Sequence, residues 1–361
     1  GGILERDRSH GWNSSLRLSR YNVRSNVDLN LSPTTLMRFN IGGYMQERIA
    51  PPQSIDGVFG DAFQTPPHVH PPRYSTGEIP RVSGRPNVWS NLTQTGYERN
   101  NRNKIETLFS LEQDLKMLVP GLKVKGTFSF DSYSDNRVTR SKNPDYYNPA
   151  IGRDPETGEL DLIIDSYGQM FLDHSTGAGF GNRSTYLEGS ITYDQTIASD
   201  HTVNALFMYN QRNYDDGSAL PFRYQGIAGR TSYMYKHRYV GEFNFGYNGS
   251  ENFAKGNRFG FFPSFAAGWI VSEEKFMENI NHVLTKLKLR GSWGLVGNDD
   301  VGVRFPYIST IDGTGEYYWG YDRNQFHRAG RREGNVANKN LKWETVAKTN
   351  KVHLVGILGF I

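Results

Sequence analysis

The chain has 361 residues, a formal net charge of +4 and no cysteine, and only 37% of its residues are hydrophobic. No apolar run reaches the ~18 residues that a membrane-spanning helix needs, so the sequence excludes a helical inner-membrane protein. Lys and Arg are scattered singly and form no basic run, which argues against nucleic-acid binding.

The first clear pattern lies in residues 21–32, where a mostly apolar series alternates without a break with a polar one. Tyr21, Val23, Val27 and Leu29 belong to the apolar series. This alternation predicts a strand with one apolar and one polar face. Such segments recur over about 10–16 residues, which is long for a soluble strand but suits a tilted strand that needs ~9–11 residues inside a bilayer.

Further strands are predicted along the rest of the chain from the same alternation. They cover residues 36–48, 104–117, 122–133, 185–195, 203–214, 239–248, 259–271 and 286–297, and a last strand starts near Trp343. The set amounts to about ten strands, whereas the largest single-chain transporter barrels have roughly 22. The predicted fold class is therefore all-β, a transmembrane antiparallel β-barrel of which about half is present.

The connections between these strands alternate in length. Tight turns are predicted at residues 32–35, 119–121 and 198–201, and long polar connections at residues 50–102, 136–183 and 215–231. An up-and-down barrel with short periplasmic turns and long extracellular loops produces this alternation, whereas a β-sandwich does not require it.

Aromatic residues gather near the predicted strand ends, where amphipathic rings would lie among lipid headgroups. The alternative is the ordinary preference of aromatic residues for strands. The residues concerned are Tyr21, Tyr133, Tyr193, Tyr214, Tyr239, Trp269 and Trp293.

Three local features are expected in the later part of the chain. Gly249 and Gly256 bracket a compact outer turn, and Pro263 predicts a bulge or an edge irregularity within its strand. Residues 272–276 predict one capped helical turn on the periplasmic side.

Candidate chemical sites are weak. His68 and His70 lack a third and fourth metal ligand nearby, so a proline-stiffened loop is the better interpretation. The acidic residues around Gly158 do not follow the calcium-loop spacing and predict a solvated hairpin loop, and residues 177–181 are a flexible loop rather than a phosphate cradle. Without a nucleophile motif, the sequence predicts no enzyme, no metal site and no cofactor.

A resemblance covers the later part of the chain in three ordered motifs. Residues 238–277 carry the first motif, residues 287–298 the second and residues 340–345 the third. The matching pieces of the first are Gly249-Ser250, Phe253, Arg258, Gly260, Phe262-Pro263-Ser264, Gly268-Trp269, and Glu274 with Phe276. Together the motifs resemble the SusC/RagA family of TonB-linked outer-membrane transporters.

The resemblance implies that residues 1–361 are part of a TonB-dependent receptor β-barrel domain, without its plug, TonB box and terminal strands. After Thr349, the sequence departs from the strand pattern that the family has at this position. The implied location is the outer membrane of a Gram-negative bacterium. The implied partners are a SusD-like surface lipoprotein, the TonB complex, outer-membrane lipid, and a glycan or peptide substrate.

Substrate capture is expected in the two long loops at residues 50–102 and 136–183, because aromatic and amide side chains suit sugar recognition. The candidate binding residues are Trp89, Tyr97, Asn143, Tyr146, Tyr147, Asn148 and Tyr167. These side chains could equally pack the loops themselves. The alternatives for the whole chain are a passive porin, a structural or adhesin barrel, and a secreted carbohydrate-binding β-sandwich.

Overall fold

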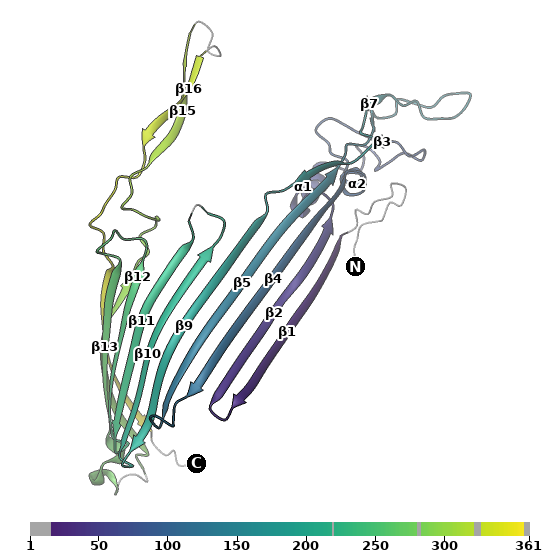
Figure 1. Ribbon diagram of the computed structural model, residues 1–361. Helices are drawn as coiled ribbons and strands as arrows, with labels where there is room; N and C mark the ends of the chain where they lie inside the picture. Colours follow the sequence, from purple (N-terminus) through teal and green to yellow (C-terminus); the bar gives the residue numbers. More distant parts are fainter. Residues whose placement is uncertain (1–15, 219, 280–282, 321–325, 357–361) are drawn as a thin grey trace. The chain divides into compact units, whose positions relative to one another are not determined.

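A computed structural model describes residues 16–218, 220–279, 283–320 and 326–356. Most of them form one large, mostly antiparallel sheet of twelve strands, eleven of which follow one another in a single order (Figure 1). In sheet order these are β1 (Arg17–Ser32), β2 (Thr35–Ala50), β4 (Gly96–Asp114), β5 (Leu122–Ser141), β9 (Phe180–Ile197), β10 (His201–Asp215), β11 (Phe222–Tyr235), β12 (Tyr239–Ser250), β13 (Phe259–Ile270), β14 (Lys286–Asn298) and β17 (Glu344–Gly356).

The strand order confirms the predicted fold class. Neighbours in the sheet are almost always neighbours in sequence, as in an up-and-down barrel, and β8 (Asp173–Thr176) pairs additionally with β5. Among the described residues, β1 and β17 stand at the two ends of the order and the sheet does not close. No helix in the described part of the chain is both long and apolar enough to span a membrane.

The chain divides into two compact units. One comprises residues 1–25, 41–106 and 131–183, and its loops contain α1 (Ile55–Gln64), α2 (Val88–Thr93) and a small sheet of β3 (Ile79–Pro80), β6 (Tyr146–Tyr147) and β7 (Ile164–Ser166). The other comprises residues 26–40, 107–130 and 184–361. It includes the strands from β10 onward and a separate two-stranded hairpin, β15 (Ile311–Trp319) with β16 (Phe326–Glu333), which was not predicted.

The prediction of a long connection at residues 215–231 is wrong. Strand β11 begins at Phe222 and pairs along its length with β10 and β12, so only residues 216–221 connect β10 to β11. The apolar series of β11 is interrupted by Gln225, Gly229 and Thr231, and this interruption made the segment resemble a loop. Backbone pairing with β10 on one side and β12 on the other holds this segment as a strand although its alternation is weak.

The other two long connections are confirmed with shifted limits. Strand β4 begins at Gly96, β5 continues to Ser141 and β9 begins at Phe180, so the connections cover residues 51–95 and 142–179. Strand β4 also ends at Asp114, earlier than predicted, and Met117 is 89% exposed in the turn that follows.

The turn before β5 contains one glycine, Gly121, that no other residue could replace without strain. Gly121 has φ +83°, and a Cβ at this position would lie 2.0 Å from the carbonyl oxygen of Asp194. A side chain is therefore excluded both by backbone conformation and by the close approach of β9.

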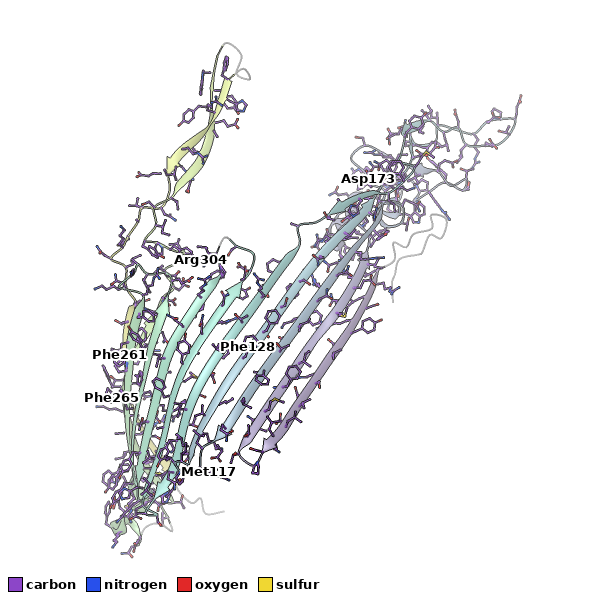
Figure 2. The ribbon with its side chains drawn as sticks, viewed as in Figure 1. Met117, Phe128, Asp173, Phe261, Phe265 and Arg304 are labelled. Atoms are coloured by element: carbon purple, nitrogen blue, oxygen red, sulfur yellow. The ribbon has the colours of Figure 1, made fainter. Side chains whose placement is uncertain are left out.

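The registers place two chemically different sets of side chains on opposite faces of β12, β13 and β14. One row on the first face reads Phe243, Phe265 and Trp293, with ring centroids 4.8 Å and 6.2 Å apart. The next residue of each strand points to the other face. Phe261 and Phe265 lie along β13 in Figure 2 and are 54% and 52% exposed. This apolar, exposed face has the character of a lipid-facing surface.

Aromatic rings form a second row at the ends of the strands nearest the short turns. His201, Tyr235, Tyr239 and Trp269 follow one another across β10 to β13, with centroids 5.0–6.5 Å apart. Their place on the apolar face supports the interpretation of a boundary girdle. Trp293 lies in the middle of β14 and Tyr133 in the middle of β5, so the prediction of these two as strand-end residues is wrong.

Pro263 marks an irregularity on one side of β13 only. The register with β12 passes through Phe245 and Pro263 without a shift, so no bulge is present there. The pairing with β14 begins at Ser264 and Gly294, directly after the proline. Because proline has no N–H group, it cannot donate a hydrogen bond to a neighbouring strand.

The segment after β13 forms two short 3₁₀ turns, Val271–Glu273 and Lys275–Met277, rather than one capped helical turn. Neither has a side-chain cap. The carboxylate of Glu274, which lies between them, instead accepts hydrogen bonds from Tyr239 Oη at 2.6 Å and Trp269 Nε1 at 3.1 Å, and pairs with Arg238. These donors lower the pKa of Glu274 below its ordinary value.

Candidate functional site

The polar face of β11 to β14 and β17 carries several charged side chains. Glu242 accepts a hydrogen bond from Arg230 at 2.7 Å and another from Asn244 at 2.8 Å. Arg230 lies on β11 and the other two residues on β12, so strand register brings them together. These two donors therefore satisfy the carboxylate of Glu242, and Arg230 also balances its negative charge.

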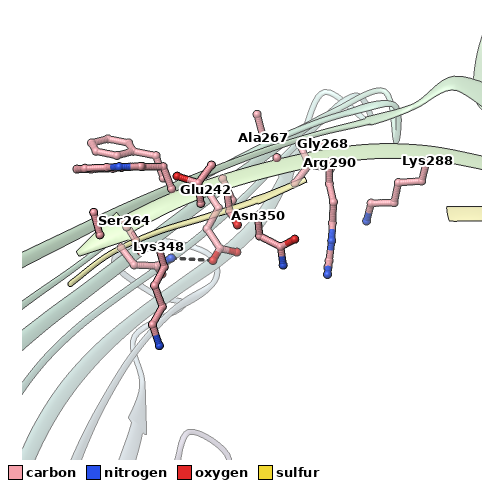
Figure 3. A pocket seen from close by; sticks show the side chains of 18 residues that line it. Glu242, Ser264, Ala267, Gly268, Lys288, Arg290, Lys348 and Asn350 are labelled. Carbon is pink, nitrogen blue, oxygen red and sulfur yellow. Dashed lines mark hydrogen bonds between the residues drawn. The ribbon is translucent and has the colours of Figure 1, made fainter. Parts of the chain in front are cut away.

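A groove of about 910 Å³ runs over this face (Figure 3). Its lining includes Lys288, Arg290 and Lys348, whose side chains project on the same side of the strands in the figure. Within the described residues, no carboxylate lies at ion-pair distance from any of these three cations. The polar face is therefore a wet, positively charged surface, as expected for the lumen side of a barrel strand.

The candidate binding residues in the loops divide by exposure. Trp89 and Tyr146 are half-buried and contribute to loop packing: the guanidinium of Arg73 lies 5.3 Å from the Trp89 ring, and Tyr146 Oη lies 3.1 Å from Ser90 Oγ. Tyr147 is half-buried beside Tyr146 in β6, between β3 and β7.

The remaining candidates have different surroundings. Tyr97 is half-buried at the start of β4, whereas Asn143, Asn148 and Tyr167 are exposed, Tyr167 by 83%. The backbone near Asn143 is held by Gln169, whose N–H donates to the Asn143 carbonyl at 2.8 Å. These three side chains are the ones with room to meet a ligand.

The acidic loop segments behave as turns. Asp154 accepts hydrogen bonds from the N–H groups of Glu156 and Thr157, and an isolated bridge joins Arg153 to Leu160. The backbone N–H groups of Thr157 and Glu156 lower the pKa of Asp154. The prediction of a hairpin loop at this position is confirmed.

Arg304 holds two loop segments together, and the sequence did not predict this role. Arg304, labelled in Figure 2, donates to the carbonyl oxygens of Leu220 at 2.7 Å and Pro221 at 3.1 Å, and its guanidinium lies 3.7 Å from the Phe222 ring centroid. It joins the β10–β11 connection to the segment after β14. A lone arginine in a polar stretch gave no signal for this role.

No protein-family model matches the chain. It is 37% identical over 122 residues to the TonB-dependent receptor SusC of Bacteroides thetaiotaomicron, a match that covers 34% of this chain and 12% of that protein. It is 26% identical over 353 residues to the TonB-dependent receptor P26 of Formosa agariphila, covering 91% of this chain and 33% of the relative. The chain thus spans at most about a third of the length of these two relatives.

Solved structures agree on the fold. The RagAB peptide importer matches with a TM-score of 0.63 in its closed-closed state and 0.62 in its open-open state, at 14% and 15% identity. Each match covers 95% of this chain and 39% or 38% of the other chain. The resemblance to SusC/RagA-type proteins is confirmed. The named relatives are receptors, not enzymes, and an outer-membrane location in a Gram-negative bacterium follows, as predicted.

Proposed function

We propose that this chain, which is SusC/RagA-like in sequence and fold, forms part of the barrel wall of a TonB-dependent active importer. The single observation that carries this proposal is the division of β12 to β14 into an apolar face, with Phe243, Phe265 and Trp293, and a charged face around Glu242. Such a strand separates lipid from an aqueous passage. The names of the relatives, TonB-dependent receptors, support TonB as the energy source, and the name of the RagAB peptide importer supports the inward direction of transport.

We propose glycan oligomers as the substrate class, with peptides as the second class, and a SusD-like lipoprotein as the partner that covers the loops. Tyr167, Asn143 and Asn148 would contact substrate directly, since their side chains are exposed. Trp89, Tyr97, Tyr146 and Tyr147 would shape the surface from below, because they are half-buried. The name of the RagAB peptide importer is the reason for testing peptides beside glycans.

The test is uptake of fluorescent oligosaccharide and peptide mixtures by cells that carry the complete protein. Active import predicts that deletion of the tonB gene abolishes uptake, whereas a passive porin predicts unchanged uptake. Tyr167→Ala should lower the apparent affinity about two- to tenfold, because one aromatic contact is lost. Met170→Ala, at a position 97% exposed in the same connection, is the matched control and should have no effect.

A further inference from the structure

The apolar face of the sheet contains an open groove of about 720 Å³ that the import function does not use. Its floor is one register row, in which Gly241 pairs with Ala267, Ala267 with Gly291 and Gly291 with Lys351. Phe243, Phe265 and Trp293 form the adjacent row and the wall of the groove. A trough with large rings beside it therefore crosses β12, β13, β14 and β17.

The glycines in the floor leave real space. A Cβ at Gly241 would meet no atom within 4 Å, and a Cβ at Gly291 would meet only the carbonyl oxygen of Asn350 at 4.0 Å. Neither glycine is required by a positive φ. Neither steric crowding nor backbone conformation therefore requires glycine at these two positions, and a larger side chain at either position would fill the trough.

The dimensions of the trough fit a single hydrocarbon chain. Four neighbouring strands span about 14 Å at ~4.8 Å per spacing. One leaflet contributes about half of the ~30 Å hydrocarbon core, and barrel strands are tilted by about 35–45°. A row perpendicular to a tilted strand is inclined to the membrane normal, so an acyl chain can follow it within one leaflet.

Lys351 adds a charge to the register row that forms the floor of the trough. Its side chain is exposed on the apolar face, and no described carboxylate lies at ion-pair distance from it. An ionised lysine among lipid chains is unfavourable without a partner, and such residues usually mark a function. The anionic groups present at a membrane surface are the phosphates of lipid headgroups.

We propose that the groove binds one acyl chain of an acidic glycerophospholipid in the periplasmic leaflet, while the ammonium group of Lys351 contacts the headgroup phosphate. The leaflet follows from the strand ends. Gly241 is the third residue of β12, close to the short turn that precedes it, and short turns are periplasmic in barrels of this kind.

The experiment reconstitutes the complete protein in nanodiscs of phosphatidylglycerol and phosphatidylcholine and counts retained lipids by native mass spectrometry. The unmodified protein should retain phosphatidylglycerol preferentially. Lys351→Gln should reduce that preference about fivefold, the effect of one lysine near a charged surface. The double variant Gly241→Leu with Gly291→Leu should lose the retained lipid, because its side chains fill the trough.

Gly189→Leu is the matched control. Gly189 lies on β9 between the exposed residues Leu187 and Ile191, and a Cβ there also meets nothing within 4 Å. It should retain lipid as the unmodified protein does. Equal loss in Gly189→Leu, unchanged lipid in the double variant, or equal retention of the two lipids by the unmodified protein would overturn the proposal. Retention of lipid A in place of phosphatidylglycerol would overturn it as well.

Discussion

Phe265→Arg in the complete protein is expected to lose folded barrel, whereas Ser292→Arg is expected to fold normally. Both variants add the same charge to neighbouring strands, since Phe265 pairs with Trp293 and Ser292 pairs with Ala266, but they place it on opposite faces. An arginine on the lipid face costs roughly 2–4 kcal/mol near the bilayer midplane. On the polar face, an exposed substitution changes stability by about 0.5 kcal/mol or less.

The measurement is the fraction of protein that migrates as the folded, heat-modifiable form in outer-membrane preparations, followed by urea titration of the purified protein. Phe265→Leu separates two contributions, because it removes the ring packing with Phe243 at 4.8 Å without adding charge. We expect Phe265→Leu to lower the free energy of unfolding by about 0.5–1.5 kcal/mol. Similar losses in Phe265→Arg and Ser292→Arg would contradict the assignment of the two faces.

Chymotrypsin added to intact cells is expected to cut the connection at residues 142–179 and to spare the turn after β4. Both segments offer suitable side chains: Tyr167 and Phe171 are 83% and 74% exposed in the connection, and Met117 and Leu118 are 89% and 76% exposed in the turn. Exposure therefore does not distinguish them. Only the side of the membrane does, because long connections are extracellular and short turns are periplasmic.

The fragments should be identified by mass spectrometry in intact cells and in lysed cells, with any partner lipoprotein deleted so that it cannot shield the loops. Lysis should add the cut near Met117. If the enzyme cut near Met117 in intact cells and left residues 142–179 whole, the topology would be inverted and the loops could not capture substrate from outside.

The sequence predicted the strands whose alternation is complete. Residues 21–32 lie within β1, and the segment at residues 239–248 lies within β12, because apolar and polar residues there repeat with the period of a strand. Strand β11 was missed because Gly229 and Thr231 occupy its apolar face. Residues 350–355, which depart from the family pattern, still pair in register with β14.

Contacts between side chains on different strands could not be predicted from the sequence. The pair Arg230 and Glu242, and the row of Gly241, Ala267 and Gly291, depend on register, which a single chain does not reveal. Among the loop candidates, composition identified the aromatic residues but not their packing. Tyr146 approaches Ser90, and this contact joins segments 56 positions apart in the sequence.

In the proposed barrel, β13 crosses a bilayer with alternate residues toward lipid and toward water. The most direct measurement places single cysteines at positions 264 to 269 of the complete protein, labels each with a nitroxide, and records its accessibility to oxygen and to a water-soluble nickel reagent. The chain itself has no cysteine that would interfere. We expect high oxygen accessibility at Phe265, Ala267 and Trp269 and low oxygen accessibility at the positions between them. An absence of alternation, or alternation in the opposite phase, would contradict this arrangement.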